Sequence, residues 1–217
     1  MAALALREYL SLLHLPTTSC ILSFAIIGGT IAPVVHLDRL LLVLLQLFLV
    51  GGVAANYLDE IQGRPWHTTI PEANLWIIGF AALAISSMLG IYIALTTVWW
   101  FLLFVAVWGF VTVAYDLELF NGRLHNTVSL ALGGGSICLG SYCLQSLTIT
   151  PQVLVIAIIV CCIAGQGRNI YEAAKPVCKD NIRSPHETSR FAWALLKTLI
   201  LFVNIVAITS LTYRILA

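Results

Sequence analysis

Three short segments hold most of the residues that can do chemistry. The first contains Asn56, Asp59 and Glu60, whose i, i+3 and i+4 spacing places them on one face of a helix. Two carboxylates and an amide oxygen form a hard-oxygen site suited to Mg²⁺, which also binds substrate phosphates. The competing interpretation is a solvated helix end that stops at Gly63 and the Arg-Pro pair 64–65.

The second segment runs from Tyr115 to Asn126 and also carries Asp116 and Arg123. A guanidinium such as that of Arg123 is suited to clamp a phosphate, and the Tyr115 hydroxyl can donate a hydrogen bond to it. The alternative is a plain turn at residues 121–122 whose flanking charges are solvated. Both interpretations stay open from these residues alone.

The third segment, residues 166–175, places Asn169 among the charged residues Arg168, Glu172 and Lys175. A site that holds an anion together with its metal ion needs such a mixture of signs. A cytoplasmic loop of a membrane protein has a similar composition. The segment therefore predicts either a part of the site or a solvated loop.

Apolar elements must position these segments, because 60% of the 217 residues are hydrophobic and only 10% are charged. A soluble domain carries about 25% charged residues. This composition excludes an ordinary cytosolic enzyme, a nucleic-acid binder and a disordered chain. We expect an all-α, polytopic transmembrane bundle that forms one domain over residues 1–217, because a helix satisfies its own backbone groups in hydrocarbon.

Charge-free stretches predict about seven membrane spans, each of which needs about 20 apolar residues. The 43 residues from Ala73 to Tyr115 must fold back on themselves, and Thr96 and Thr97 mark the expected turn. Another long stretch divides at a polar break that ends at Pro151. The expected helices are residues 15–35, 40–58, 73–95, 98–115, 127–146, 151–168 and 191–213.

Lysine and arginine predict the orientation of these spans. With seven spans, nine of the basic residues fall on the side of the N-terminus and two, Arg39 and Arg214, on the other. The side with the excess is expected to be cytoplasmic, and nearly all acidic residues lie there too. The nine basic residues are Arg7, Arg64, Arg123, Arg168, Lys175, Lys179, Arg183, Arg190 and Lys197.

The first segment resembles the first aspartate-rich motif of the UbiA superfamily of intramembrane prenyltransferases. That motif reads NDxxDxxxD and is followed shortly by Arg-Pro. Asn56 matches its Asn, Glu60 takes the place of the next-turn Asp, and residues 64–65 match the Arg-Pro. The chain departs from the motif at Tyr57, which replaces an Asp, and at Asp59, an extra carboxylate one position early.

The resemblance covers all predicted spans in order. The segment from Tyr115 to Arg123 is similar to the loop with which the family contacts diphosphate. The segment after the sixth span stands where the second aspartate motif belongs, and it offers Asn169 and Glu172 without a DxxxD pattern. The family usually has nine spans, so this chain looks two spans short.

The resemblance implies a UbiA-like fold and an intramembrane prenyltransferase. Such an enzyme ionises an isoprenyl diphosphate with Mg²⁺ and transfers the prenyl group to an aromatic or lipid acceptor. The expected partners are the isoprenyl diphosphate and membrane lipids, at an active face in the cytoplasm. The implied catalytic residues are Asp59, Glu60 and Tyr115; the substrate-binding residues are Asn56, Arg64, Asp116, Arg123, Arg168, Asn169 and Lys175; the metal ligands are Asn56, Asp59, Glu60 and Glu172.

A second function stays open: a UbiA-like membrane protein that binds or moves a lipid without transferase activity. It is favoured by the small number of carboxylates, since Asp59 and Glu60 have only Glu172 opposite them in the eroded second motif. A transporter built from inverted repeats is disfavoured, because the spans carry no mid-membrane acidic residue.

The predicted topology can be tested by cysteine labelling in a background without the native cysteines. Single cysteines near Arg39 and near Asp180 are expected to react with an impermeant reagent from opposite sides of the membrane. This follows from the excess of basic residues on the N-terminal side. Labelling of both positions from the cytoplasm would contradict the topology.

Overall fold

The computed structural model describes the backbone of residues 2–175 and 187–216 and the side chains of residues 6–175 and 189–216. This part of the chain is helical and contains no strand. Seven helical segments are long and apolar enough to cross a membrane, as predicted, so the chain is built as a multi-pass membrane protein. The predicted loop residues Lys179, Asp180 and Arg183 lie outside the described residues. The seven segments are Leu6–Ile31, Leu37–Asp59, Glu72–Thr96, Trp99–Asp116, Thr127–Ser146, Pro151–Ala174 and Ser189–Leu216.

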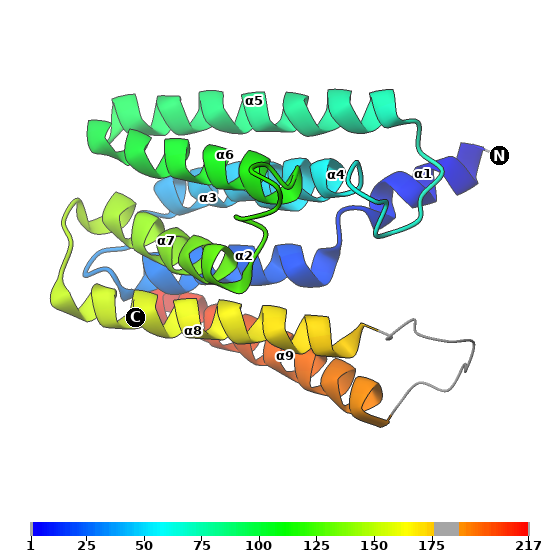
Figure 1. The fold of residues 1–217 in the computed structure, drawn as a ribbon. Helices are drawn as coiled ribbons and strands as arrows, with labels where there is room; N and C mark the ends of the chain where they lie inside the picture. Colours follow the sequence, from blue (N-terminus) through cyan, green and yellow to red (C-terminus); the bar gives the residue numbers. More distant parts are fainter. Residues whose placement is uncertain (1, 176–186, 217) are drawn as a thin grey trace.

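The helices run back and forth in one bundle, and neighbours in sequence are neighbours in space (Figure 1). The elements are α1 (Ala2–Ser11), α2 (Leu15–Ile31), α3 (Leu37–Leu47), the π-helix η1 (Phe48–Ala54), α4 (Ala55–Asp59), α5 (Glu72–Thr96), the 3-10 turn η2 (Trp99–Phe101), α6 (Leu102–Asp116), α7 (Thr127–Ser146), α8 (Pro151–Ala174) and α9 (Glu187–Leu216). Each span packs against the next, α9 returns to α2, and α2 also packs along α7. The contact between α2 and α7 divides the interior of the bundle.

Small residues allow these helices to approach closely. A Cβ atom at Gly28 of α2 would overlap the backbone carbonyl of Cys138 on α7. A Cβ atom at Gly135 would overlap the Cys161 side chain of α8. Lipid is as apolar as leucine, so close packing through small residues is a main source of helix association in a membrane.

Hydrogen bonds between side chains attach α9 to α2. The Ser23 hydroxyl donates to Asn204 Oδ1 at 2.7 Å, and Asn204 Nδ2 donates to Ser19 Oγ at 3.1 Å. Nearer the C-terminal ends of the two helices, the hydroxyls of Thr30 and Ser210 lie 2.5 Å apart. A polar side chain within a span is costly unless it finds such a partner, so these bonds select the pairing of α2 with α9.

The second span differs from the expected regular helix, because its middle is the π-helix η1. Gly51 and Gly52 lie here, and Cβ atoms at these positions would crowd Ile21 and Thr18 of α2. The Asn56 Nδ2 donates to the Gly52 carbonyl at 2.8 Å, which satisfies part of the widened turn. π-Helical turns are rare and frequently lie at functional sites, and this one directly precedes α4.

We call one end of the bundle the polar end. It carries α1, the connections 60–71 and 117–126, and the C-terminal end of α8 (Figure 1). Here α8 continues to Ala174 rather than ending at residue 168. Its last turns contain good helix formers and the i, i+4 pair of Arg168 and Glu172, whose charged atoms lie 3.9 Å apart. The third segment is therefore helical and not a loop.

The close approach of α2 and α7 predicts a stability difference between two glycines. Gly28→Ala should lower the free energy of unfolding by about 1–3 kcal/mol, because the new methyl group meets rigid backbone. Gly133→Ala on α7 is the matched control, since a Cβ there meets nothing within 4 Å. Unfolding in detergent, followed by tryptophan fluorescence, measures both. Equal stability of the two variants would contradict the close packing.

Candidate functional site

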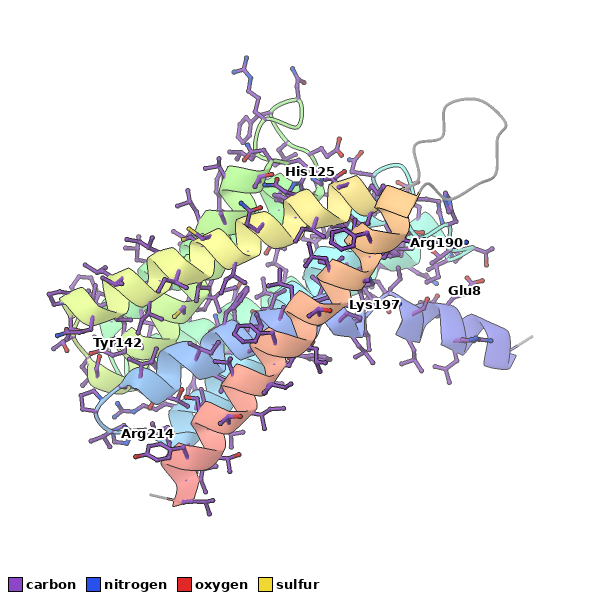
Figure 2. All side chains as sticks on the ribbon, turned by 90° about the horizontal axis from the view of Figure 1, so that it is seen from below. Glu8, His125, Tyr142, Arg190, Lys197 and Arg214 are labelled. Atoms are coloured by element: carbon purple, nitrogen blue, oxygen red, sulfur yellow. The ribbon has the colours of Figure 1, made fainter. Side chains whose placement is uncertain are left out.

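The connections after α4 and α6 and the last turns of α8 meet at the polar end. Gln62 Nε2, after α4, donates to the Leu117 carbonyl at 3.3 Å, after α6. The Arg168 guanidinium of α8 donates to the His125 carbonyl at 3.2 Å, and Figure 2 shows His125 beside this part of α8. The Thr127 hydroxyl donates to Asn169 Oδ1 at 2.9 Å, which brings the start of α7 into the same region.

Tyr115 forms an aromatic platform at this junction. The His125 ring stacks on it with 4.3 Å between ring centroids, and His125 Nδ1 lies 3.0 Å from the Tyr115 carbonyl oxygen. The Arg168 guanidinium carbon lies 5.2 Å from the centre of the Tyr115 ring. Because only 12% of the Arg168 side chain is exposed, the platform holds a nearly buried positive charge.

Two carboxylates lie together beside this platform. Asp59 ends α4 and Asp116 ends α6, the two helices pack against each other, and the two carboxyl groups lie within electrostatic range of each other. Asp116 is only 8% exposed. Among the described residues, neither carboxylate forms a hydrogen bond or an ion pair. A nearly buried carboxylate without a partner is costly, which marks this acidic pair as a candidate site.

Groups of both signs surround Asp59. It lies within electrostatic range of Lys175 and His125 and also of the carboxylates of Glu60 and Glu118. The Lys175 ammonium stands over the Tyr171 ring, 4.7 Å from its centre. The site therefore combines carboxylates with the Lys175 ammonium and the His125 imidazole, a composition suited to a metal ion and an anion together.

Glu60 has a different environment from Asp59, although the two are adjacent in sequence. Its side chain is fully buried, and its carboxylate accepts bonds from the backbone N–H groups of Trp66 and Thr68, both at 2.9 Å. The Thr68 hydroxyl adds a third bond at 2.8 Å. Helix α4 ends at Asp59, so Glu60 turns into the following connection. This geometry gives Glu60 a structural role in the connection 60–71, and its role as a catalytic residue and metal ligand stays a prediction.

The side chains of Arg64 and Asn56 also donate hydrogen bonds to backbone carbonyl groups. The Arg64 guanidinium donates to the carbonyls of Thr68 and Ile70 at 2.8 and 3.0 Å, and so closes the 60–71 connection. Asn56 directs its amide nitrogen to Gly52. Arg64 therefore contributes to the fold of this connection, and its role in diphosphate binding stays a prediction; the Asn56 amide oxygen has no partner among the described residues.

The remaining predicted residues differ in their access to the acidic pair. Arg123 is exposed in the 117–126 connection, and among the described residues its guanidinium has no partner. The side-chain carbonyl oxygen of Asn169 accepts the hydrogen bond from the Thr127 hydroxyl. Glu172 is 44% exposed and pairs with Lys175 at 3.0 Å on its own helix. Of these, only Lys175 interacts electrostatically with Asp59.

His125 and Tyr171 belong to the cluster but were not among the predicted site residues. Both have signals in the sequence: His125 immediately precedes the helix cap Asn126, and Tyr171 stands between Arg168 and Lys175. Their importance depends on stacking against aromatic and cationic groups from other spans. Residue type and spacing carry no information on that contact.

The acidic pair fits a cation that a substrate helps to hold. In the part of the chain that the structure describes, no three His, Cys, Asp or Glu side chains are grouped to bind a metal by themselves. Protein-bound Mg²⁺ commonly uses one or two carboxylates plus phosphate oxygens and water. Asp59 and Asp116 meet that smaller requirement, whereas Glu60 does not.

The role of Glu60 gives a stability prediction. Glu60→Ala should lower the free energy of unfolding by about 2–4 kcal/mol, because buried N–H groups of Trp66 and Thr68 lose their acceptor. Proteolysis within residues 61–71 should accelerate in parallel. Glu118→Ala is the control, since Glu118 is an exposed carboxylate. The contrary outcome is a wild-type protein that Mg²⁺ stabilises and a Glu60→Ala variant that Mg²⁺ does not stabilise. That outcome would show that Glu60 is a metal ligand.

Comparison of the chain with known protein families, with curated proteins and with solved structures finds no match.

Proposed function

We propose that this protein binds an isoprenyl diphosphate together with Mg²⁺ at the polar end and acts as a UbiA-like intramembrane prenyltransferase. The observation that supports the proposal is the pair of carboxylates Asp59 and Asp116, which have no protein partner among the described residues, at the end of the bundle where the nearly buried Arg168 lies over the Tyr115 ring. A long apolar substrate would lie among the spans, with its charged group at their polar end.

Asp59 and Asp116 would hold the metal ion. Both are carboxylates at the ends of packed helices, and neither is committed to a partner among the described residues. When bound, Mg²⁺ would neutralise negative charge on a departing diphosphate. The proposed metal ligands are therefore Asp59 of α4 and Asp116 of α6. They replace the set that the family resemblance implies, which is Asn56, Asp59, Glu60 and Glu172.

Arg168 and Lys175 would bind the diphosphate. Arg168 already contacts the Tyr115 ring and the His125 carbonyl, so its charge is held in place before any ligand arrives. Lys175 lies on the same helix and within range of Asp59. The Tyr115 and Tyr171 hydroxyls are additional donors at the same junction.

A second candidate function is binding or movement of the same lipid without transfer. It is favoured by the commitment of Glu60 to the 60–71 connection and of Glu172 to Arg168 and Lys175. Fewer of the described carboxylates then remain for metal. Release of diphosphate from an allylic substrate separates the two functions, because the second requires binding alone.

The site predicts metal-linked binding of a non-cleavable isoprenyl thiodiphosphate to the purified protein. Wild type should bind it more tightly in Mg²⁺ than in EDTA. Asp59→Asn and Asp116→Asn should each weaken binding in Mg²⁺ by about 10-fold to 100-fold, the equivalent of about 1.5–3 kcal/mol for a contact to a charged group. In EDTA both variants should match wild type.

Asp38→Asn is the control for this titration, since Asp38 is an exposed carboxylate at the opposite end of the bundle. Arg168→Gln should weaken binding both with and without Mg²⁺. Equal wild-type affinity in EDTA and Mg²⁺ would exclude the metal role of the acidic pair. Lack of binding under both conditions would exclude the diphosphate as ligand.

A further inference from the structure

Two basic residues of α9 lie within the last span and lack the partners that other span cations have. Among the described residues, neither Arg190 nor Lys197 forms an ion pair or a hydrogen bond. By contrast, Arg39 donates to the Leu144 carbonyl at 3.2 Å, and Arg214 donates to the Pro33 carbonyl at 2.7 Å. The span cations at the opposite end thus have protein partners, whereas these two have none among the described residues.

Arg190, Trp193 and Lys197 are spaced i, i+3 and i+7, so they share one face of α9, which we call the basic face. Figure 2 shows Arg190 and Lys197 on the half of α9 nearer the polar end. Lys197 is eight residues past Ser189, where the span begins, or about 12 Å along the helix axis. An exposed ammonium at that depth extends toward the headgroups of the adjacent leaflet.

Apolar and aromatic surface adjoins the basic face. Trp193 is 39% exposed and meets the Tyr171 ring edge-to-face, with 6.0 Å between ring centroids. Leu201, one turn deeper than Lys197, is 60% exposed. Trp and Tyr favour the headgroup level of a membrane. The face therefore combines cations at headgroup depth with an apolar surface below them.

Two acidic side chains near the polar end have other partners. Glu8 accepts bonds from the Thr69 backbone N–H at 2.9 Å and from the Thr69 hydroxyl at 2.8 Å. Glu172 is bound to Lys175 at 3.0 Å. Among the side chains that the structure describes, none neutralises the basic face, and the complementary groups in a membrane are lipid phosphates.

We propose that the basic face of α9 binds the headgroup of an anionic glycerophospholipid in the leaflet at the polar end. Arg190 and Lys197 contact the phosphate and the acidic headgroup, and the acyl chains lie along Trp193 and Leu201. This site adjoins the polar end through the contact of Trp193 with Tyr171 but uses different charged residues, and the inference does not depend on the proposed function.

Native mass spectrometry of the full chain in detergent tests this site with phosphatidylglycerol and phosphatidylcholine. Wild type should bind phosphatidylglycerol more tightly. Lys197→Gln and Arg190→Gln should each weaken that binding about fivefold, because one basic residue near a membrane surface contributes about 1 kcal/mol of attraction to anionic lipid. Phosphatidylcholine binding should be the same in all variants, which also reports that they are folded.

Lys197→Arg should retain the wild-type affinity, because it keeps the charge. Arg123→Gln, which removes an exposed cation from the 117–126 connection, is the matched control and should also bind as wild type does. Equal binding of the two lipids by wild type, or an unchanged affinity in Lys197→Gln, would overturn the proposal. Displacement of phosphatidylglycerol by an isoprenyl phosphate at equal concentration would overturn it too, by assigning the face to the isoprenoid.

Discussion

Every polar group placed among apolar spans must find a partner, because hydrocarbon offers none. This constraint explains the helices themselves and most of the polar contacts between them. Asn204 reaches Ser19 and Ser23 and so pairs α9 with α2. Asn56 returns to the carbonyl of Gly52 in the π-helix. Partner selection by isolated polar side chains, together with close approach at glycine, gives the bundle its helix order.

Charged side chains without a protein partner among the described residues mark the two candidate sites. Asp59 and Asp116 are such carboxylates, and they lie at the ends of the packed helices α4 and α6. Arg190 and Lys197 are cations with the same property on the outer surface of α9. The first group is suited to a cation and an anion at the polar end, and the second to lipid phosphate. In both groups the charged side chains remain available to a ligand, whereas side chains with a purely structural role would be paired with other protein groups.

Adjacent residues illustrate how the end of a helix divides structural from chemical roles. Asp59 is the last residue of α4 and interacts with groups of α6 and α8, whereas Glu60 folds the connection that follows. Glu60 with Thr68, and Arg64 with Ile70, build a rigid connection at the foot of the second span. Removal of that connection would release the end of α4, so the position of Asp59 depends on it.

The sequence by itself determined the helical class, the seven spans and their turns, because charge-free stretches of bilayer length are a local property. It also placed the chemistry-bearing segments after the second, fourth and sixth spans, since alternate spans end on the same side. Only the tertiary structure separated Asp59 from Glu60, paired Asp59 with Asp116, and placed Arg168 against Tyr115. Those arrangements depend on where each helix ends and on contacts between spans that are distant in sequence. Residue spacing along one helix cannot report them, because it predicts a shared face and not what lies opposite it.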